Sequence, residues 1–208
     1  MKKILFQGDS ITDSERDRNS ETDLGKGYAN LVASKIGFEN PLKFEFINRG
    51  IGGSKAIDIY SRIKCDIINL QPDILSITVG VNDVWQDFVL QNGLSVYKFR
   101  QIYSMLIEEV REALPDIKIM LLEPFFMEGT VTRGKMDKFA PIKEMAKTVR
   151  ELCEKYNLRF ITLQDKFDKA TELAPPEYWS IDGIHPTCAG HELIKNEWIK
   201  AFEEYVEE

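Results

Sequence analysis

The feature that most constrains the fold is a regular alternation of short apolar runs with longer segments of helical period. The short runs predict strands at Lys3–Phe6, Lys43–Ile47, Ile74–Val79, Lys118–Leu122 and Arg159–Leu163. The longer segments have the apolar spacing of amphipathic helices at Gly27–Ile36, Ser95–Leu114, Lys138–Tyr156 and about Ala189–Val206. Because strands that alternate with helices form βαβ units, we expect an α/β fold. The predicted architecture is a three-layer α/β/α sandwich with a five-stranded parallel sheet, of the flavodoxin type.

Length and composition bound the number of domains. The chain has 208 residues, of which 43% are hydrophobic and 29% are charged, as in an ordinary globular protein. The sequence contains no low-complexity linker, internal repeat or shift of composition. We therefore expect one domain over residues 1–208.

The charge and the apolar runs exclude some classes of partner. A formal net charge of −7 weighs against nucleic acid, because phosphate binding needs a basic surface. The apolar run Ile4–Phe6 is too short for the core of a signal peptide, and no run approaches the length of a membrane span. The sequence predicts a soluble, cytoplasmic protein with no membrane partner, and it leaves a homo-oligomer open.

Metal and cofactor motifs are missing from the sequence. Cys65, Cys153 and Cys188 are far apart and lack the paired spacing of a zinc site, so we expect reduced thiols. Neither a Walker phosphate loop nor a full Gly-x-Gly-x-x-Gly motif occurs. We expect no metal and no cofactor.

Glycine and small polar residues follow the predicted strands. These segments are Gly8–Thr12, Asn48–Gly53, Gly80–Asp83 and the loop that ends in Asp182–Pro186. In open parallel sheets, ligands bind beyond the carboxyl ends of the strands. We therefore expect these segments to meet at one edge of the sheet.

The residues in these segments suit acyl transfer, which needs a nucleophile, a base, a group that orients the base and donors for an oxyanion. Ser10 is the candidate nucleophile, and His185 is the candidate base because its pKa is ordinarily near neutrality. Asp182 is placed to hold the imidazole of His185 in the required tautomer. The backbone N–H groups of Ser10 and Gly53 and the side-chain amide of Asn82 are candidate oxyanion donors.

Each of these residues also has a purely structural interpretation. A serine after a strand is commonly a turn residue or a helix cap, and Asn82 can cap the helix that follows the third strand. Asp9 is predicted to tie neighbouring loops together through backbone N–H groups. His191 is predicted to be a solvated or hydrogen-bonded residue at the start of the last helix.

The four segments, taken together, resemble the four motifs of the SGNH hydrolase superfamily, also called the GDSL hydrolases. The resemblance extends from residue 4 to about residue 194, and the motifs occur in the expected order. It implies the same fold, Ser10 as nucleophile, Asp182 and His185 as the rest of a catalytic triad, and Gly53 and Asn82 as oxyanion donors. Ile11 stands where the family often has leucine.

A narrower resemblance concerns the intracellular acetylxylan esterase branch of this superfamily. It rests on Gly8–Asp13, Gly25–Tyr28, Val81–Trp85, Pro124–Gly129 and His185–His191. It implies a serine carboxylic-ester hydrolase that forms an acyl-enzyme and deacetylates small acetylated sugars such as xylo-oligosaccharides. The expected partner is thus a small-molecule ester, with an acetylated sugar as the leading candidate.

Two alternatives stay open at this point. The same site suits a thioesterase, a lysophospholipase or a general arylesterase. A flavodoxin-like binding or signalling module, with an acidic pocket around Asp9 and Asp13, would give His185 no role. Four aromatic residues are candidates for lining the substrate site, although packing in the core is the commoner fate of such side chains: Trp85, Phe125, Tyr178 and Trp179.

Overall fold

The computed structural model contains a parallel sheet with the strand order β2-β1-β3-β4-β5. The structure describes residues 1–206. The strands are β1 (Lys2–Gly8), β2 (Phe44–Asn48), β3 (Ile74–Thr78), β4 (Lys118–Leu122) and β5 (Arg159–Ile161). Their order is that of the flavodoxin-like fold, in which the direction of winding reverses between β1 and β3. The predicted five-stranded parallel sheet is confirmed, and each predicted strand end is within two residues of the observed one.

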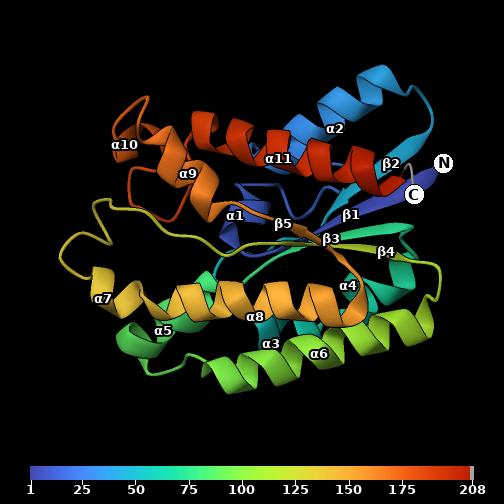
Figure 1. Ribbon diagram of the computed structural model, residues 1–208. Helices are drawn as coiled ribbons and strands as arrows, with labels where there is room; N and C mark the ends of the chain where they lie inside the picture. Colours follow the sequence, from blue (N-terminus) through green and yellow to red (C-terminus); the bar gives the residue numbers. More distant parts are fainter. Residues whose placement is uncertain (207–208) are drawn as a thin grey trace.

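Helices cover both faces of the sheet (Figure 1). One face packs against α2 (Tyr28–Glu39) and α11 (Cys188–Val206), and the other packs against α3 (Ala56–Ser61), α6 (Val96–Ala113) and α8 (Pro141–Tyr156). The remaining helices are short: α1 (Ser10–Asp13), α4 (Ile63–Asp66), the 3-10 helix η1 (Ile68–Leu70), α5 (Val81–Leu90), α7 (Met136–Phe139), α9 (Gln164–Ala170) and α10 (Pro176–Trp179). This confirms the predicted three-layer arrangement.

The core is divided by the sheet into two apolar clusters. Successive side chains of a strand point to opposite faces, so Ile4 and Phe6 of β1 pack toward α2 and α11, whereas Leu5 packs toward α3, α6 and α8. All three side chains are fully buried. Burial on both faces explains why the strand sequences are continuous apolar runs rather than alternating patterns.

One predicted helix is interrupted. The sequence pattern indicated a single helix over Lys138–Tyr156, but the structure has α7 up to Phe139 and a new helix from Pro141. Proline has no N–H to donate within a helix, and it is favoured at the first position of one. Pro141 therefore begins α8 and separates it from α7.

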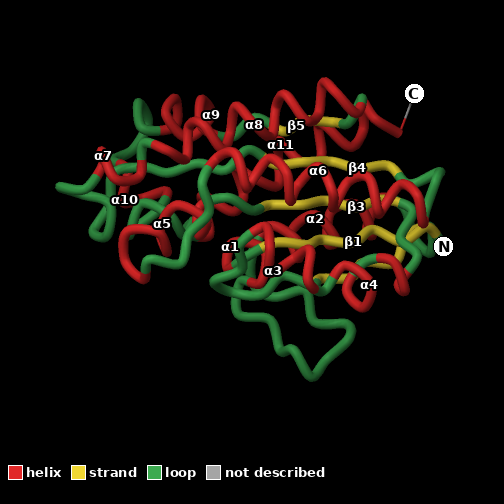
Figure 2. Tube along the Cα trace, turned by 90° about the horizontal axis from the view of Figure 1, so that it is seen from below, coloured by secondary structure: helices red, strands yellow, loops and turns green. Residues whose placement is uncertain are grey.

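The carboxyl ends of the strands lie at the end of the molecule that carries α1, α5, α7 and α10 (Figure 2). The amino terminus lies at the opposite end of the sheet. Within residues 1–206, none of the helices combines the length and the apolar character needed to span a membrane.

Candidate active site

Ser10 is the first residue of α1, directly after β1 and Asp9. The Asp9 side chain caps this helix, because its Oδ1 accepts a hydrogen bond of 3.0 Å from the backbone N–H of Ile11. A side chain on Gly8 would begin 2.4 Å from Thr12 Oγ1 and 2.5 Å from the Thr78 carbonyl oxygen. Only glycine fits there, and the resulting tight turn brings the Ser10 hydroxyl to the edge of the sheet.

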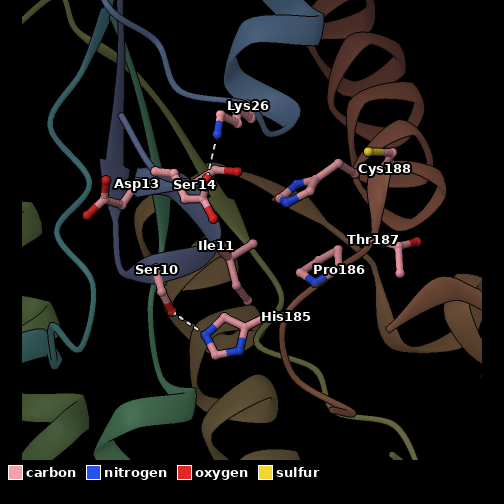
Figure 3. Close-up of a pocket in the computed structure, with 11 residues that line it drawn as sticks. Ser10, Ile11, Asp13, Ser14, Lys26, His185, Pro186, Thr187 and Cys188 are labelled. Atoms are coloured by element: carbon pink, nitrogen blue, oxygen red, sulfur yellow. Dashed lines mark hydrogen bonds and ion pairs between the residues drawn. The ribbon is translucent and has the colours of Figure 1, made fainter. Parts of the chain in front are cut away.

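The side chains of Ser10, His185 and Asp182 form a continuous hydrogen-bonded chain. Ser10 Oγ lies 2.7 Å from His185 Nε2 (Figure 3), and His185 Nδ1 lies 2.5 Å from Asp182 Oδ2. The other oxygen of Asp182 accepts the backbone N–H groups of Ile184 at 2.8 Å and His185 at 2.7 Å. Gly183, with φ +89°, allows the chain to turn back so tightly. The structure therefore brings the predicted nucleophile, base and orienting carboxylate together.

The charge of Asp182 favours proton transfer to His185. Burial alone would raise the pKa of Asp182, but hydrogen bonds from the His185 side chain and from two backbone N–H groups lower it to about 2. The hydrogen bond to Asp182 raises the pKa of His185 above its usual range, against the opposing effect of burial. Asp182 thus stays ionised and stabilises the imidazolium that forms when His185 accepts a proton.

The predicted oxyanion donors lie on three segments: Ser10 in α1, Gly53 in the loop after β2 and Asn82 in α5. Asn82 is in the first turn of α5, and its Nδ2 lies 3.2 Å from the Ser54 carbonyl oxygen and 3.4 Å from Asp9 Oδ2. Gly53 has φ +82°, a conformation that favours glycine. A side chain on the preceding residue, Gly52, would begin 3.7 Å from Ser10 Cβ, so this loop lies against the serine. Neither Ser10 nor Gly53 uses its backbone N–H in a hydrogen bond to another described residue.

Two buried carboxylates support the same loops. Asp83 is fully buried, and both of its oxygens accept the backbone N–H of Ala56, at 3.1 and 3.3 Å. Burial raises the pKa of Asp83 to about 7 and that of Asp9 to about 6, although hydrogen bonds from the backbone oppose the rise. Asp9 accepts the backbone N–H of Ile11 in its own helix and contacts α5 only through the Asn82 side chain, so it does not tie loops together through backbone N–H groups as predicted. Asp83 does this instead, because it links α5 to the backbone N–H of Ala56.

The four aromatic candidates have different surroundings. The Trp85 ring is partly buried, with its centroid 6.3 Å from that of His185. Phe125 is fully buried and stacks on Phe167 at 4.2 Å, so it is a core residue, and its prediction as a substrate-binding residue is wrong. Its ring packs on the side of the sheet that α11 covers, away from solvent.

The other two aromatics support the segment that follows His185. Tyr178 is exposed and packs edge-on against Trp179, at 5.1 Å between centroids. Their carbonyl oxygens accept hydrogen bonds from the side chain and the backbone N–H of Thr187, at 2.7 and 2.8 Å. Neither ring lines the cleft beside Ser10, so their prediction as substrate-binding residues gains no support from this cleft.

A cleft of about 520 Å³ opens beside Ser10 and His185. Its walls come from the segments Ser10–Glu15 and His185–Cys188, together with Lys26 and His191. Ser14, Lys26 and His191 were not predicted as site residues, because they lie outside the ends of the predicted strands. Within residues 1–206, no group of three or more His, Cys, Asp or Glu side chains is arranged to hold a metal ion.

Comparison with known proteins identifies the family of this chain. The model of the GDSL-like lipase/acylhydrolase family matches residues 6–193. The chain belongs to this family. As a GDSL acylhydrolase, it is a carboxylic ester hydrolase, which sets aside the alternative of a non-enzymatic binding module.

Relatives of this GDSL hydrolase are similar over nearly the whole chain. An acetylxylan esterase from Geobacillus stearothermophilus is 31% identical over 209 residues, which cover 96% of this chain and 93% of the relative. A structure described as a GDSL-like lipase from Parabacteroides merdae has a TM-score of 0.92 and 38% identity, covering 96% and 94% of the two chains. Axe2, an acetylxylan esterase from Geobacillus stearothermophilus, has a TM-score of 0.86 and 27% identity, covering 96% and 93%. These similarities agree with the predicted SGNH fold.

Proposed function

We propose that this GDSL hydrolase is a serine esterase that removes acetyl groups from small acetylated sugars such as xylo-oligosaccharides. Ser10 is its nucleophile, His185 its general base and Asp182 the residue that orients the base. The observation that carries the proposal is the hydrogen-bonded chain from Ser10 Oγ through His185 to Asp182, with distances of 2.7 and 2.5 Å.

In the first half of the reaction, Ser10 Oγ attacks the ester carbonyl carbon while His185 Nε2 accepts the hydroxyl proton. The carbonyl oxygen gains negative charge and is stabilised by the N–H groups of Ser10 and Gly53 and by the Asn82 amide. His185 then donates its proton to the alcohol oxygen, and the bond between that oxygen and the carbonyl carbon breaks. The alcohol leaves, and the acyl group stays on Ser10.

In the second half, water repeats the attack on the acyl-enzyme. His185 accepts a proton from the water as its oxygen bonds to the carbonyl carbon, and the same N–H groups stabilise the oxyanion. The bond to Ser10 Oγ breaks, and His185 returns the proton to Ser10. The carboxylic acid is released and the enzyme returns to its starting state.

Two features support a short acyl group on a hydroxylated alcohol. The acetylxylan esterase relative is 31% identical over 96% of this chain, and the structures with TM-scores near 0.86 include Axe2 variants described as acetyl-xylooligosaccharide esterases. Other Axe2 variants, with a serine or an aspartate replaced by alanine, are described as catalytic mutants. The cleft beside Ser10 includes the polar side chains of Ser14 and Lys26, which can hydrogen-bond the hydroxyls of a polyol.

The test compares acyl lengths and alcohols. Acetyl, butyryl and octanoyl esters of one phenol are assayed for kcat/KM, followed by acetate release from acetylated xylose and xylobiose. If the acyl site fits only a methyl group, a longer acyl chain overpacks it at a cost of about 1–3 kcal/mol. The kcat/KM of acetyl esters should then exceed that of butyryl esters by about tenfold or more. Preference for octanoyl esters, or inertness of the acetylated sugars, would instead favour the lipase or thioesterase alternatives.

A further inference from the structure

The cleft beside Ser10 lies on the side of the serine from which the alcohol must leave. His185 Nε2 donates the proton to the leaving alcohol oxygen, so that oxygen has to lie within hydrogen-bond reach of it. The cleft is lined by His185 and by the segment that follows it, whereas the oxyanion donors Gly53 and Asn82 do not line it. The alcohol half of the ester therefore enters this cleft.

A second histidine, His191, lines the same cleft from the first turn of α11. Its Nδ1 accepts a hydrogen bond of 3.1 Å from the backbone N–H of Tyr28. In a neutral imidazole, the nitrogen that accepts carries no proton, so the proton of His191 is on Nε2. This nitrogen makes no hydrogen bond to another described residue, and it is not among the buried side-chain atoms without a partner. His191 Nε2 is thus a donor with a fixed tautomer that remains available in the cleft.

Gly27 allows Ser14 and His191 to pack close to each other beside the cleft. A side chain on Gly27 would begin 2.7 Å from Ser14 Oγ and 2.8 Å from His191 Cε1. The backbone of Gly27 has φ −103°, which any residue can adopt, so close packing rather than conformation excludes a side chain there. Ser14 and Lys26 lie across the cleft from His185 (Figure 3). The Ser14 hydroxyl and the imidazole of His191 therefore both pack directly against the Gly27 backbone, and both line the cleft.

His191 remains neutral under conditions in which His185 can act as a base. Burial, with a smaller effect of the nearby His185 charge, lowers the pKa of His191 to about 4. The residue is 7% exposed overall, so most of the ring is shielded from solvent. The Nε2–H donor is present at every pH at which the triad is active.

We propose that His191 is a specificity-determining residue whose Nε2–H donates a hydrogen bond to a hydroxyl of the alcohol half of the ester. This rests on the proposed esterase function and adds to it a subsite for that hydroxyl. The ligand group is a hydroxyl on the carbon next to the ester-bearing carbon, as in a partly acetylated sugar ring. An alcohol without that hydroxyl leaves the His191 donor without a partner.

The test uses two acetates that differ only in this hydroxyl: trans-cyclohexane-1,2-diol monoacetate and cyclohexyl acetate. The readout is the ratio of their kcat/KM values, because damage to the triad or to folding lowers both rates alike. Comparison of variant with wild type also cancels the intrinsic difference in reactivity between the two esters. A neutral hydrogen bond in such a site is worth about two- to tenfold in this ratio.

Two substitutions separate recognition from structure. In His191→Asn, the side-chain oxygen takes the place of Nδ1 and keeps the bond to Tyr28, but no donor reaches the position of Nε2. In His191→Gln, the amide reaches the position of Nε2, but the bond to Tyr28 is lost. We expect His191→Asn to lose the two- to tenfold preference for the diol monoacetate and His191→Gln to keep most of it.

Glu192→Gln is the matched control, because the neighbouring Glu192 pairs with Lys195 and lines a different groove, between α9 and α11. It should keep the wild-type ratio. The proposal is overturned if His191→Asn keeps the wild-type ratio, or if wild type does not discriminate between the acetates. Failure of wild type to hydrolyse either acetate would overturn the proposed acetylesterase function, and the subsite with it.

Discussion

Ser10 Oγ and His185 Nε2 lie 2.7 Å apart although 175 positions separate the two residues in the chain. Each reaches this position through its own tight turn. Gly8 allows the close packing at the turn before α1. Gly183 allows the turn in which Asp182 accepts hydrogen bonds from the backbone and the ring of His185. We therefore expect separate and measurable roles for the residues around this hydrogen bond.

Asp182 should control both the rate and its dependence on pH. His185 acts as a base only when it is neutral, and Asp182 raises its pKa, so the wild-type rate should rise with pH through a midpoint above 6.5. In Asp182→Asn the midpoint should move to lower pH, because the ionic partner is gone. The kcat should fall by about 10⁴, because the wrong tautomer of His185 is then favoured.

The measurement for Asp182 is kcat/KM for an aryl acetate from pH 5 to 9, with circular dichroism to show that the variant is folded. An unchanged midpoint together with a nearly normal kcat would show that Asp182 only shapes the turn.

Asn82 should act on the transition state rather than on substrate binding. Loss of one oxyanion donor typically lowers kcat by about 10²–10³, or roughly 3–4 kcal/mol. Asn82→Ala should therefore lower kcat and kcat/KM together and leave KM nearly unchanged. Steady-state kinetics with one acetyl ester decide this. An increase in KM alone would assign Asn82 to the support of the Ser54 loop, whose carbonyl oxygen it contacts.

Asp83 should make the folded protein less stable as the pH rises toward neutrality. Its pKa is raised from 3.8 to about 7 in the folded protein. Between about pH 4 and 7 the folded state therefore holds a proton that the unfolded chain has released. Stability contributed by this proton falls as the pH rises, by about 1.4 kcal/mol per pH unit.

Asp83→Asn removes this titration while an amide oxygen can still accept the N–H of Ala56. The free energy of unfolding in urea should then fall less steeply between pH 5 and 7 than in wild type. The exposed Asp116 provides a control, since Asp116→Asn should keep the wild-type slope. Equal slopes for wild type and Asp83→Asn would contradict the buried, proton-binding state of Asp83.

Most of the fold could be predicted from the sequence, because burial on both faces of the sheet makes each strand a continuous apolar run. The prediction of one helix over residues 138–156 was wrong at Pro141. The apolar spacing of a helix continues across α7 and α8, and this spacing does not show that proline lacks the N–H needed inside a helix. Helices as short as α3 and α9 were not predicted, since six or seven residues are too few to show a helical period. The expectations of one domain over residues 1–208, a cytoplasmic location and a homo-oligomer stay predictions.

The residues grouped at the site were predicted because each follows a strand or closes a glycine turn. Phe125 was misassigned because nearness to a motif in sequence does not say which face of the sheet a side chain points to. His191 was not assigned to the site because it lies in α11, outside the strand ends, and its bond to the N–H of Tyr28 joins residues 163 positions apart. A contact of that kind leaves no local pattern.

Covalent labelling tests whether Ser10 is the nucleophile. The enzyme is treated with a small organophosphonate, and its intact mass and peptide masses are measured beside residual esterase activity. Ser34→Ala, at an exposed position of α2, controls for substitution of a serine. We expect one adduct, on Ser10, with activity lost in proportion to labelling. The Ser10→Ala variant should be folded, inactive and unlabelled. An adduct on another residue, together with an active Ser10→Ala variant, would contradict it.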